Sequence, residues 1–183
     1  MKVRVCLCAV LIALFASFSF AQSTATHEVS FGYSFLRPGI NQHGWVSSFS
    51  ERINDRLWLK VEAGGNYRKT TFLSGKQPNF EHSILAGPEF KLRRDSKLVP
   101  WAHVLAGITM HNHPVATFNN GGLTFLRKTD VRFGFQPGGG IDYYFSPKIG
   151  LRLGADYRRA IENFNDENFF RAQGGIILRF GGK

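Results

Sequence analysis

Residues 130–145 read DVRFGFQPGGGIDYYF. Successive residues of this stretch alternate in character, as they do in a β-strand whose two faces meet different surroundings. The apolar face consists of Val131, Phe133, Phe135, Pro137, Gly139, Ile141, Tyr143 and Phe145. The other face is polar or small and consists of Asp130, Arg132, Gly134, Gln136, Gly138, Gly140, Asp142 and Tyr144. The stretch predicts a long strand with one apolar and one polar side.

The same period of two recurs along the chain. The alternating stretches are 28–35, 43–51, 56–63, 83–91, 98–110, 130–145, 149–158 and 170–180. Most are close to the roughly 9–11 residues with which a tilted strand crosses a bilayer. The sequence therefore predicts about eight strands of membrane-spanning length.

The connections between these stretches alternate in length. Short polar turns are expected at 53–55, 94–96 and 146–147. Longer connections are expected at 67–79, 111–127 and 159–168, with a shorter one at 37–42. This rhythm is typical of barrels with short periplasmic turns and longer extracellular loops. It predicts an all-β fold, an eight-stranded antiparallel up-and-down transmembrane β-barrel with both termini in the periplasm.

Several strands carry charge in mid-span on one face only. Because a charge facing lipid at the bilayer midplane costs about 2–4 kcal/mol, the charged face is expected to point into the barrel. The predicted interior charges are Lys60, Glu62, Glu89, Lys91, Arg132, Asp142, Arg152, Asp156, Arg171 and Arg179. Side chains fill a barrel of this size, so we expect a plugged polar interior. Inward glycines such as Gly138 and Gly154 would leave room for long arginine side chains.

The N-terminal segment has the pattern of a secretory signal peptide. Lys2 and Arg4 precede an apolar run, and small residues lead up to Ala21. The expected domains are a signal peptide over 1–21 and an outer-membrane barrel over 22–183. Both cysteines, Cys6 and Cys8, lie in the signal peptide, so the mature chain would have no disulfide and no thiolate site.

The net charge of +10 is spread over scattered basic residues. In an exported protein, excess positive charge favours attraction to an anionic surface over nucleic-acid binding. The expected partners are outer-membrane lipid and lipopolysaccharide, with no nucleic acid.

The sequence offers little catalytic or metal-binding chemistry. His111 and His113 could donate two nitrogens to Zn²⁺, but no acidic residue is adjacent in sequence, and a solvated loop is expected. The adjacent residues His82 and Ser83 would point to opposite faces of a strand, and Glu81 would share the face of Ser83. No catalytic, cofactor or metal residue is predicted, and the protein is expected not to be an enzyme.

The chain resembles the outer-membrane β-barrel proteins grouped with the OmpA-type membrane domain and the opacity-type porins. The resemblance rests on Phe31-Gly32-Tyr33, Leu85–Phe90, Gly138–Tyr143 and Gly174–Phe180, and it covers residues 27–181. It implies a final strand whose terminal aromatic residue is read by the barrel assembly machinery. Here that residue is Phe180, and Gly181-Gly182-Lys183 follow it.

Three hypotheses of function follow. The first is a non-enzymatic, monomeric barrel of the bacterial outer membrane that acts through its loops in adhesion, surface interaction or envelope integrity. The second is a soluble lipocalin-like barrel of the periplasm or the exterior, with its apolar face turned inward around an apolar ligand. The third is a membrane-embedded lipid A deacylase or acyltransferase, whose catalytic residues would have to converge from different strands.

Overall fold

A computed structural model describes residues 25–37, 41–72, 75–92, 96–119, 122–161 and 167–181. The regular elements within these ranges are all β-strands. They are β1 (His27–Arg37), β2 (Gln42–Arg52), β3 (Leu57–Phe72), β4 (Gly75–Lys91), β5 (Leu98–Asn119), β6 (Gly122–Tyr144), β7 (Ile149–Ile161) and β8 (Glu167–Phe180). Within the described ranges, no helix is long and apolar enough to cross a membrane. The predicted signal peptide, 1–21, lies outside the described residues.

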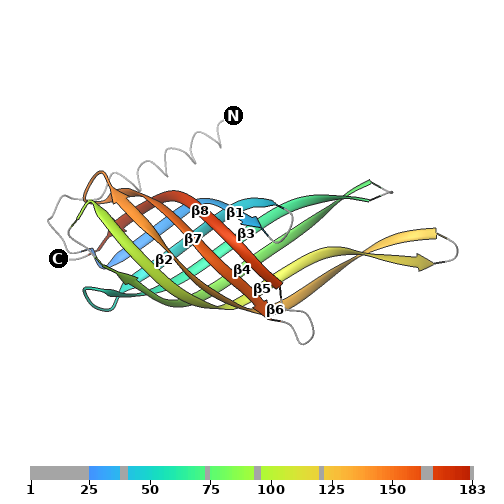
Figure 1. Cartoon of the computed structure of the whole chain (residues 1–183), viewed down its shortest axis with the longest axis horizontal. Helices are drawn as coiled ribbons and strands as arrows, with labels where there is room; N and C mark the ends of the chain where they lie inside the picture. The colour runs from blue at the N-terminus through green and yellow to red at the C-terminus, as the bar shows by residue number, and fades with distance from the viewer. Residues whose placement is uncertain are drawn as a thin grey trace, which may run out of the picture.

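The strands form one closed barrel. Each strand pairs antiparallel with the next one along the chain, and β8 pairs with β1 to complete the ring, as Figure 1 shows. The closing pair brings His27 opposite Phe180, so the two ends of the described barrel wall are neighbours. The strands run obliquely around the barrel, as closure of a sheet requires. The prediction of an eight-stranded up-and-down β-barrel is confirmed.

One end of the barrel carries tight turns, and we call it the turn end. Between β2 and β3, the Asn54 side-chain oxygen accepts hydrogen bonds from the backbone N–H groups of Arg56 and Leu57, at 3.0 and 2.8 Å. Between β6 and β7, the Ser146 hydroxyl accepts one from the Ile149 N–H at 3.1 Å. Short polar side chains stabilise such turns by capping their own backbone. The turns predicted at 53–55 and 146–147 are confirmed, and that at 94–96 lies largely outside the described residues.

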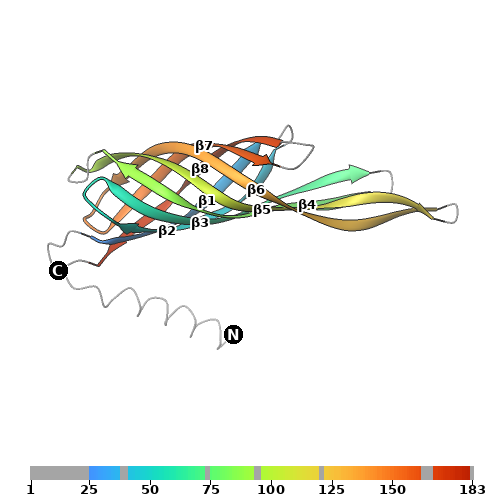
Figure 2. The ribbon, with the colours of Figure 1, turned by 90° about the horizontal axis from the view of Figure 1, so that it is seen from below.

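At the opposite end, two hairpins continue as two-stranded ribbons, and we call it the ribbon end. Pairing in the β3–β4 hairpin reaches Phe72 opposite Gly75, and pairing in the β5–β6 hairpin reaches Asn119 opposite Gly122. Figure 2 shows both hairpins reaching past the other strands.

The prediction of long loops at 67–79 and 111–127 is therefore wrong. The described residues of both ranges lie in strands whose backbone groups bond to the other arm of the same hairpin. The predicted connection at 159–168 is also too long. β7 runs to Ile161 and β8 begins at Glu167, with 162–166 outside the described residues. The shorter connection expected at 37–42 is bounded by Arg37 and Gln42, with 38–40 outside the described residues.

The outer surface of the barrel wall is apolar. Large hydrophobic side chains there are widely exposed, for example Phe31 at 62% and Leu153 at 63%. Outward aromatic residues lie towards both ends, including Phe90 and Tyr143 near the turn end and Tyr157 near the ribbon end. A continuous exposed apolar surface of this kind marks contact with lipid or a partner, because water disfavours it.

Candidate functional site

The inward face of the barrel wall carries the charged residues. Nine side chains from the predicted set are buried there, namely Lys60, Glu62, Glu89, Lys91, Arg132, Asp142, Arg152, Asp156 and Arg171. Arg179 also points inward and is half-buried near the turn end. Because a buried charge without a partner is costly, the contacts of these groups determine whether the interior is stable.

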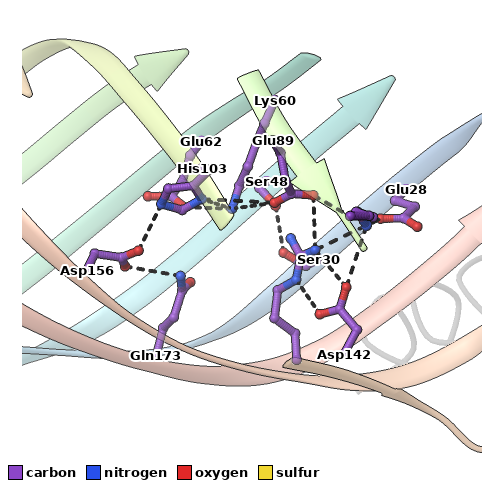
Figure 3. A network of polar contacts seen from close by, with 12 residues as sticks. Glu28, Ser30, Ser48, Lys60, Glu62, Glu89, His103, Asp142, Asp156 and Gln173 are labelled. Atoms are coloured by element: carbon purple, nitrogen blue, oxygen red, sulfur yellow. Dashed lines mark hydrogen bonds and ion pairs between the residues drawn. The ribbon is translucent and has the colours of Figure 1, made fainter. Parts of the chain in front are cut away.

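The first cluster of ion pairs lies towards the turn end. Lys91 contacts the carboxylate of Glu28, and its Nζ lies 3.3 Å from Glu89 and 3.5 Å from Asp142. Arg152 donates hydrogen bonds from Nε and Nη2 to the two oxygens of Asp142, at 2.7 and 2.9 Å. This two-pronged contact is the geometry in which a guanidinium pairs most strongly with a carboxylate. Figure 3 shows Asp142 and Glu89 facing each other across this cluster.

The second cluster lies nearer the ribbon end. Arg171 Nη2 is 2.6 Å from Asp156 Oδ2 and 2.7 Å from Glu62 Oε1. His103 Nε2 lies 2.8 Å from the other oxygen of Asp156, and His103 Nδ1 lies 3.2 Å from Lys60 Nζ. Lys60 Nζ is also 3.2 Å from Glu62. His103 therefore connects Lys60 to Asp156, as the row from Lys60 to Asp156 in Figure 3 shows.

These contacts cross the lumen. Arg171 of β8 reaches Glu62 of β3, and Arg152 of β7 reaches Glu89 of β4 at 3.2 Å. Neither pair of strands is adjacent in the ring. Side chains therefore meet across the barrel, and paired charges occupy its interior.

Two inward tryptophans fill much of the remaining space. Trp58 and Trp101 are both nearly fully buried. Lys91 Nζ lies 4.8 Å from the centre of the Trp58 ring, and the Arg152 guanidinium lies 4.8 Å from that of Trp101. Cations placed over indole rings in this way gain a cation–π attraction that increases as water is excluded.

The inward glycines make room for groups other than the expected arginines. A Cβ built on Gly154 would lie 2.6 Å from the Trp101 ring, and one on Gly138 would lie 1.9 Å from Asp156 Oδ1. The prediction that these glycines accommodate arginine side chains is therefore wrong. They allow a bulky indole and a short carboxylate to approach the backbone, since any side chain at these positions would collide with them.

Several polar and charged groups of the interior are absent from the set predicted from the sequence. Glu28 contacts Lys91 and also accepts a hydrogen bond from Arg179 Nε at 2.9 Å. His103 bridges Lys60 and Asp156, and Arg158 donates from Nε to Gln136 at 2.7 Å. All of these residues have the inward parity of their strands, and this parity is the signal that could have identified them.

At the ribbon end, histidines and carboxylates gather at the rim. His111 Nδ1 lies 3.8 Å from Glu81 and 3.9 Å from Glu167, and His113 Nδ1 lies 3.7 Å from Asp130. The prediction of a solvated loop for His111 and His113, away from acidic groups, is wrong, because both sit on β5 beside carboxylates from other strands. Among the described residues, no group of three or more histidines, cysteines or carboxylates could hold a metal ion.

The carboxylates of this rim are paired with basic groups. Lys128 Nζ lies 2.9 Å from Asp130, and Arg132 Nη1 lies 2.8 Å from Glu167. The hydrogen bond from Lys128 holds the pKa of Asp130 below its usual value. Asp130 is therefore ionised at neutral pH.

His82 and Ser83 point to opposite faces of β4. Ser83 is buried inside the barrel, whereas His82 faces outward, with its Nε2 3.3 Å from the Tyr67 hydroxyl. The Trp45 indole N–H donates to the same hydroxyl at 3.1 Å. The adjacent histidine and serine therefore do not form a catalytic pair with each other.

Comparison with known proteins gives matches of structure only. No protein-family model and no curated protein matches the chain. The solved structures of similar fold include Neisserial surface protein A, with a TM-score of 0.60, 14% identity and coverage of 84% of this chain and 96% of that one. The chain has the fold of the small outer-membrane β-barrel proteins.

Two further structures agree. OprG of Pseudomonas aeruginosa matches with a TM-score of 0.61 and 11% identity, over 87% of this chain and 98% of that one. Ail, the attachment invasion locus protein of Yersinia pestis, matches with a TM-score of 0.56 and 13% identity, over 85% and 97%. Identities this low establish the fold alone. The apolar outer surface and the charged interior of this chain are consistent with that fold.

Proposed function

We propose that this protein is a non-enzymatic barrel that acts at the cell surface through its ribbon end, in adhesion or surface interaction. The observation that carries the proposal is the β5–β6 ribbon. β5 pairs with β4 only as far as Asn112, and β6 pairs with β7 only from Phe133, yet the two strands continue together to Asn119 and Gly122. A barrel that acts only through its membrane-spanning strands would not need two strands that extend beyond them.

The plugged interior supports the same conclusion. Since ion pairs and tryptophans occupy the lumen, we expect the barrel to offer no path for a solute. What the protein presents to other molecules is then its lipid-facing belt and its two ends. Short turns leave little surface at the turn end, so the ribbons are the larger surface. We place the ribbon end outside the cell and the turn end in the periplasm, as in barrels with this loop pattern.

The surface of the ribbon suits an anionic partner. Arg127 and Lys128 are exposed on opposite faces of the β6 arm, and the carboxylate of Asp130 is already paired with Lys128. The similar protein Ail has been crystallised in complex with the heparin analogue sucrose octasulfate. Exposed cations bind such sulfated groups by charge, which gives binding that weakens as salt increases.

The test compares bacteria that display the intact protein with bacteria that display a variant lacking residues 114–126. Cells with the intact protein should adhere to immobilised heparin or host cells, and the shortened variant should lose that adhesion while remaining in the outer membrane at the same level. A second variant, Lys128→Gln, keeps the contacts of Arg127 with Asn112 and Pro78 and should weaken heparin binding selectively. Equal adhesion by all three strains would overturn the proposal.

The lipocalin alternative is not retained. It requires an apolar interior, whereas the structure turns the charged face inward and the apolar face outward. The lipid A enzyme alternative is tested by mass spectrometry of lipid A from cells with and without the protein. An unchanged acyl pattern is the outcome that our proposal expects.

We propose further that export depends on the segment 1–21 and that assembly depends on the final strand. β8 ends at Phe180, where it pairs with the first residue of β1 and closes the barrel. In this proposal the assembly machinery recognises Phe180, and the folded monomer then contacts lipopolysaccharide. Phe180→Ala should lower the amount of folded protein in the outer membrane without changing the amount synthesised.

A further inference from the structure

A histidine and a carboxylate face each other at the place where the two ribbons separate. β4 and β5 are paired as far as Phe80 and Asn112, and beyond that pair their hairpins diverge, as Figure 1 shows. One pair before this point, Glu81 of β4 lies opposite His111 of β5. Both side chains are on the inward face of their strands, and we call them the fork pair.

The fork pair is in contact without a hydrogen bond. His111 Nδ1 lies 3.8 Å from Glu81 Oε2, and neither atom has a hydrogen-bond partner among the described residues. Elsewhere in the barrel, His103 Nε2 lies 2.8 Å from Asp156 Oδ1. The longer separation in the fork pair is that of two acceptors with no proton between them. Since Glu81 is only 2% exposed, its oxygen is poorly placed to bond with water instead.

The other charged and titratable groups around the fork pair come from all the neighbouring strands. They are Arg68 of β3, His113 of β5, Lys128, Asp130 and Arg132 of β6, Arg158 of β7 and Glu167 of β8. The carboxylates of Glu167 and Asp130 have cations of their own, at 2.8 and 2.9 Å. Among the described residues, the only basic nitrogen within 4.0 Å of the Glu81 carboxylate is that of His111. Glu81 is therefore the carboxylate left for His111.

The two neighbouring histidines compete for protons. The rings of His111 and His113 are 4.9 Å apart, so positive charges on both would repel each other. His113 Nδ1 lies 3.7 Å from Asp130, which already receives a hydrogen bond from Lys128. The first proton therefore goes to the fork pair, where two facing atoms both lack a donor. Because the two groups share this proton, the titration belongs to the pair.

A second contact holds the same two hairpins together on the outward face. Arg127 of β6 donates a hydrogen bond to the carbonyl of Pro78 on β4 at 3.1 Å, and its guanidinium lies 4.9 Å from the centre of the Phe80 ring. An arginine is not deprotonated in a protein, so this contact is the same at every pH used below. The hairpins are thus joined on one face, and a contact on the inward face controls the angle between them.

We propose that the fork pair is a pH-sensitive latch between the two ribbons. One proton taken up between His111 Nδ1 and Glu81 Oε2 turns the near contact into a hydrogen bond that ties β4 to β5 where the hairpins part. Loss of that proton leaves two acceptors facing each other, and the ribbons then move more freely about this point. Acidification therefore fixes the ribbons relative to each other. The latch does not depend on which side of the membrane the ribbon end faces or on adhesion.

The test measures how well defined the distance between the ribbons is. Nitroxide labels are attached to cysteines that replace Thr71 and Thr124, exposed residues of the two hairpins, in a chain with Cys6→Ser and Cys8→Ser. Pulsed electron paramagnetic resonance in phosphatidylcholine vesicles gives the width of the distance distribution. The measurements are made at about pH 8.5 and about pH 5.5, on either side of the ordinary histidine pKa of about 6.5. With the fork pair intact, the width should fall by half or more at the lower pH.

Two variants of the fork pair should remove the pH dependence in opposite directions. Glu81→Gln supplies an amide N–H that donates to His111 Nδ1 at either pH, so its distribution should be narrow at both. His111→Leu removes the contact, so its distribution should be broad at both. The matched control is His82→Gln, next to Glu81 on β4 but on the outward face, which should keep the full change with pH.

Three results would overturn the latch. They are a width that does not change with pH when the fork pair is intact, a broad distribution for Glu81→Gln at about pH 8.5, and a pH-dependent width in His111→Leu. If His111→Leu does not fold, Glu81→Gln decides alone, because a narrower distribution is a gain of order that a folding defect does not produce.

Discussion

Arg171 binds one carboxylate oxygen of Asp156 through two nitrogens, Nε at 2.8 Å and Nη2 at 2.6 Å. The same Nη2 lies 2.7 Å from Glu62 on the far side of the lumen. One guanidinium thus compensates two buried carboxylates from β3 and β7. Removal of this shared cation leaves both carboxylates buried with fewer partners, which costs more than the pair itself contributes.

The first prediction follows from this contact. Arg171→Met keeps most of the volume of the side chain and removes its charge, so Glu62 and Asp156 lose their common partner. We expect the free energy of unfolding in vesicles to fall by about 3–5 kcal/mol. Urea titration followed by tryptophan fluorescence measures it. The control is Arg56→Met, at an exposed turn position, which should change the stability by less than about 0.5 kcal/mol. Equal effects of the two changes would contradict the importance of the buried network.

The alternation of side chains made the barrel predictable. A strand between lipid and a narrow interior must alternate apolar and polar side chains. The sequence therefore indicates that Arg152 points inward and Leu153 points outward. The cross-lumen partners could not be predicted in the same way. The pairing of Arg152 with Glu89 depends on how far neighbouring strands are shifted relative to one another around the barrel. No local sequence pattern indicates that shift.

The extent of the hairpins was also beyond local sequence reasoning. Around Pro114 the alternation of apolar residues weakens, because the ribbon has no lipid on one side and no packed interior on the other. The pattern that identifies a membrane strand is therefore lost while the strand continues to Asn119. Hydrogen bonds to the other arm of the hairpin maintain this part of the strand.

The second prediction concerns the close approach at Gly138. A Cβ there would lie 1.9 Å from Asp156 Oδ1 and 2.8 Å from His103 Nε2, so Gly138→Ala must displace the carboxylate from its partners. We expect a loss of about 1–3 kcal/mol in unfolding free energy, as for other overpacked interiors. Thermal unfolding of the folded barrel measures it. Gly174→Ala, where a Cβ would meet only the flexible end of Leu153, is the matched change and should cost little.

The third prediction concerns conductance. Ion pairs such as Arg152 with Glu89 join strands on different sides of the lumen, so we expect no continuous water path for ions. Purified protein in a planar bilayer should show no stepwise conductance in concentrated potassium chloride. A porin-sized, regular step that disappears with specific antibody would show that the interior opens and would contradict the plugged barrel.

The fourth prediction compares two outward leucines at different depths. Leu153 lies in the middle of β7, and Leu98 is the first residue of β5, at the turn end. Because the cost of a lipid-facing charge depends on depth, Leu153→Arg should lower the unfolding free energy by about 2–4 kcal/mol and Leu98→Arg by about 0–1 kcal/mol. Urea unfolding in vesicles of one lipid measures both. Similar costs at the two positions would mean that the apolar surface around Leu153 does not face the centre of a bilayer, because only a bilayer distinguishes these two exposed leucines by depth.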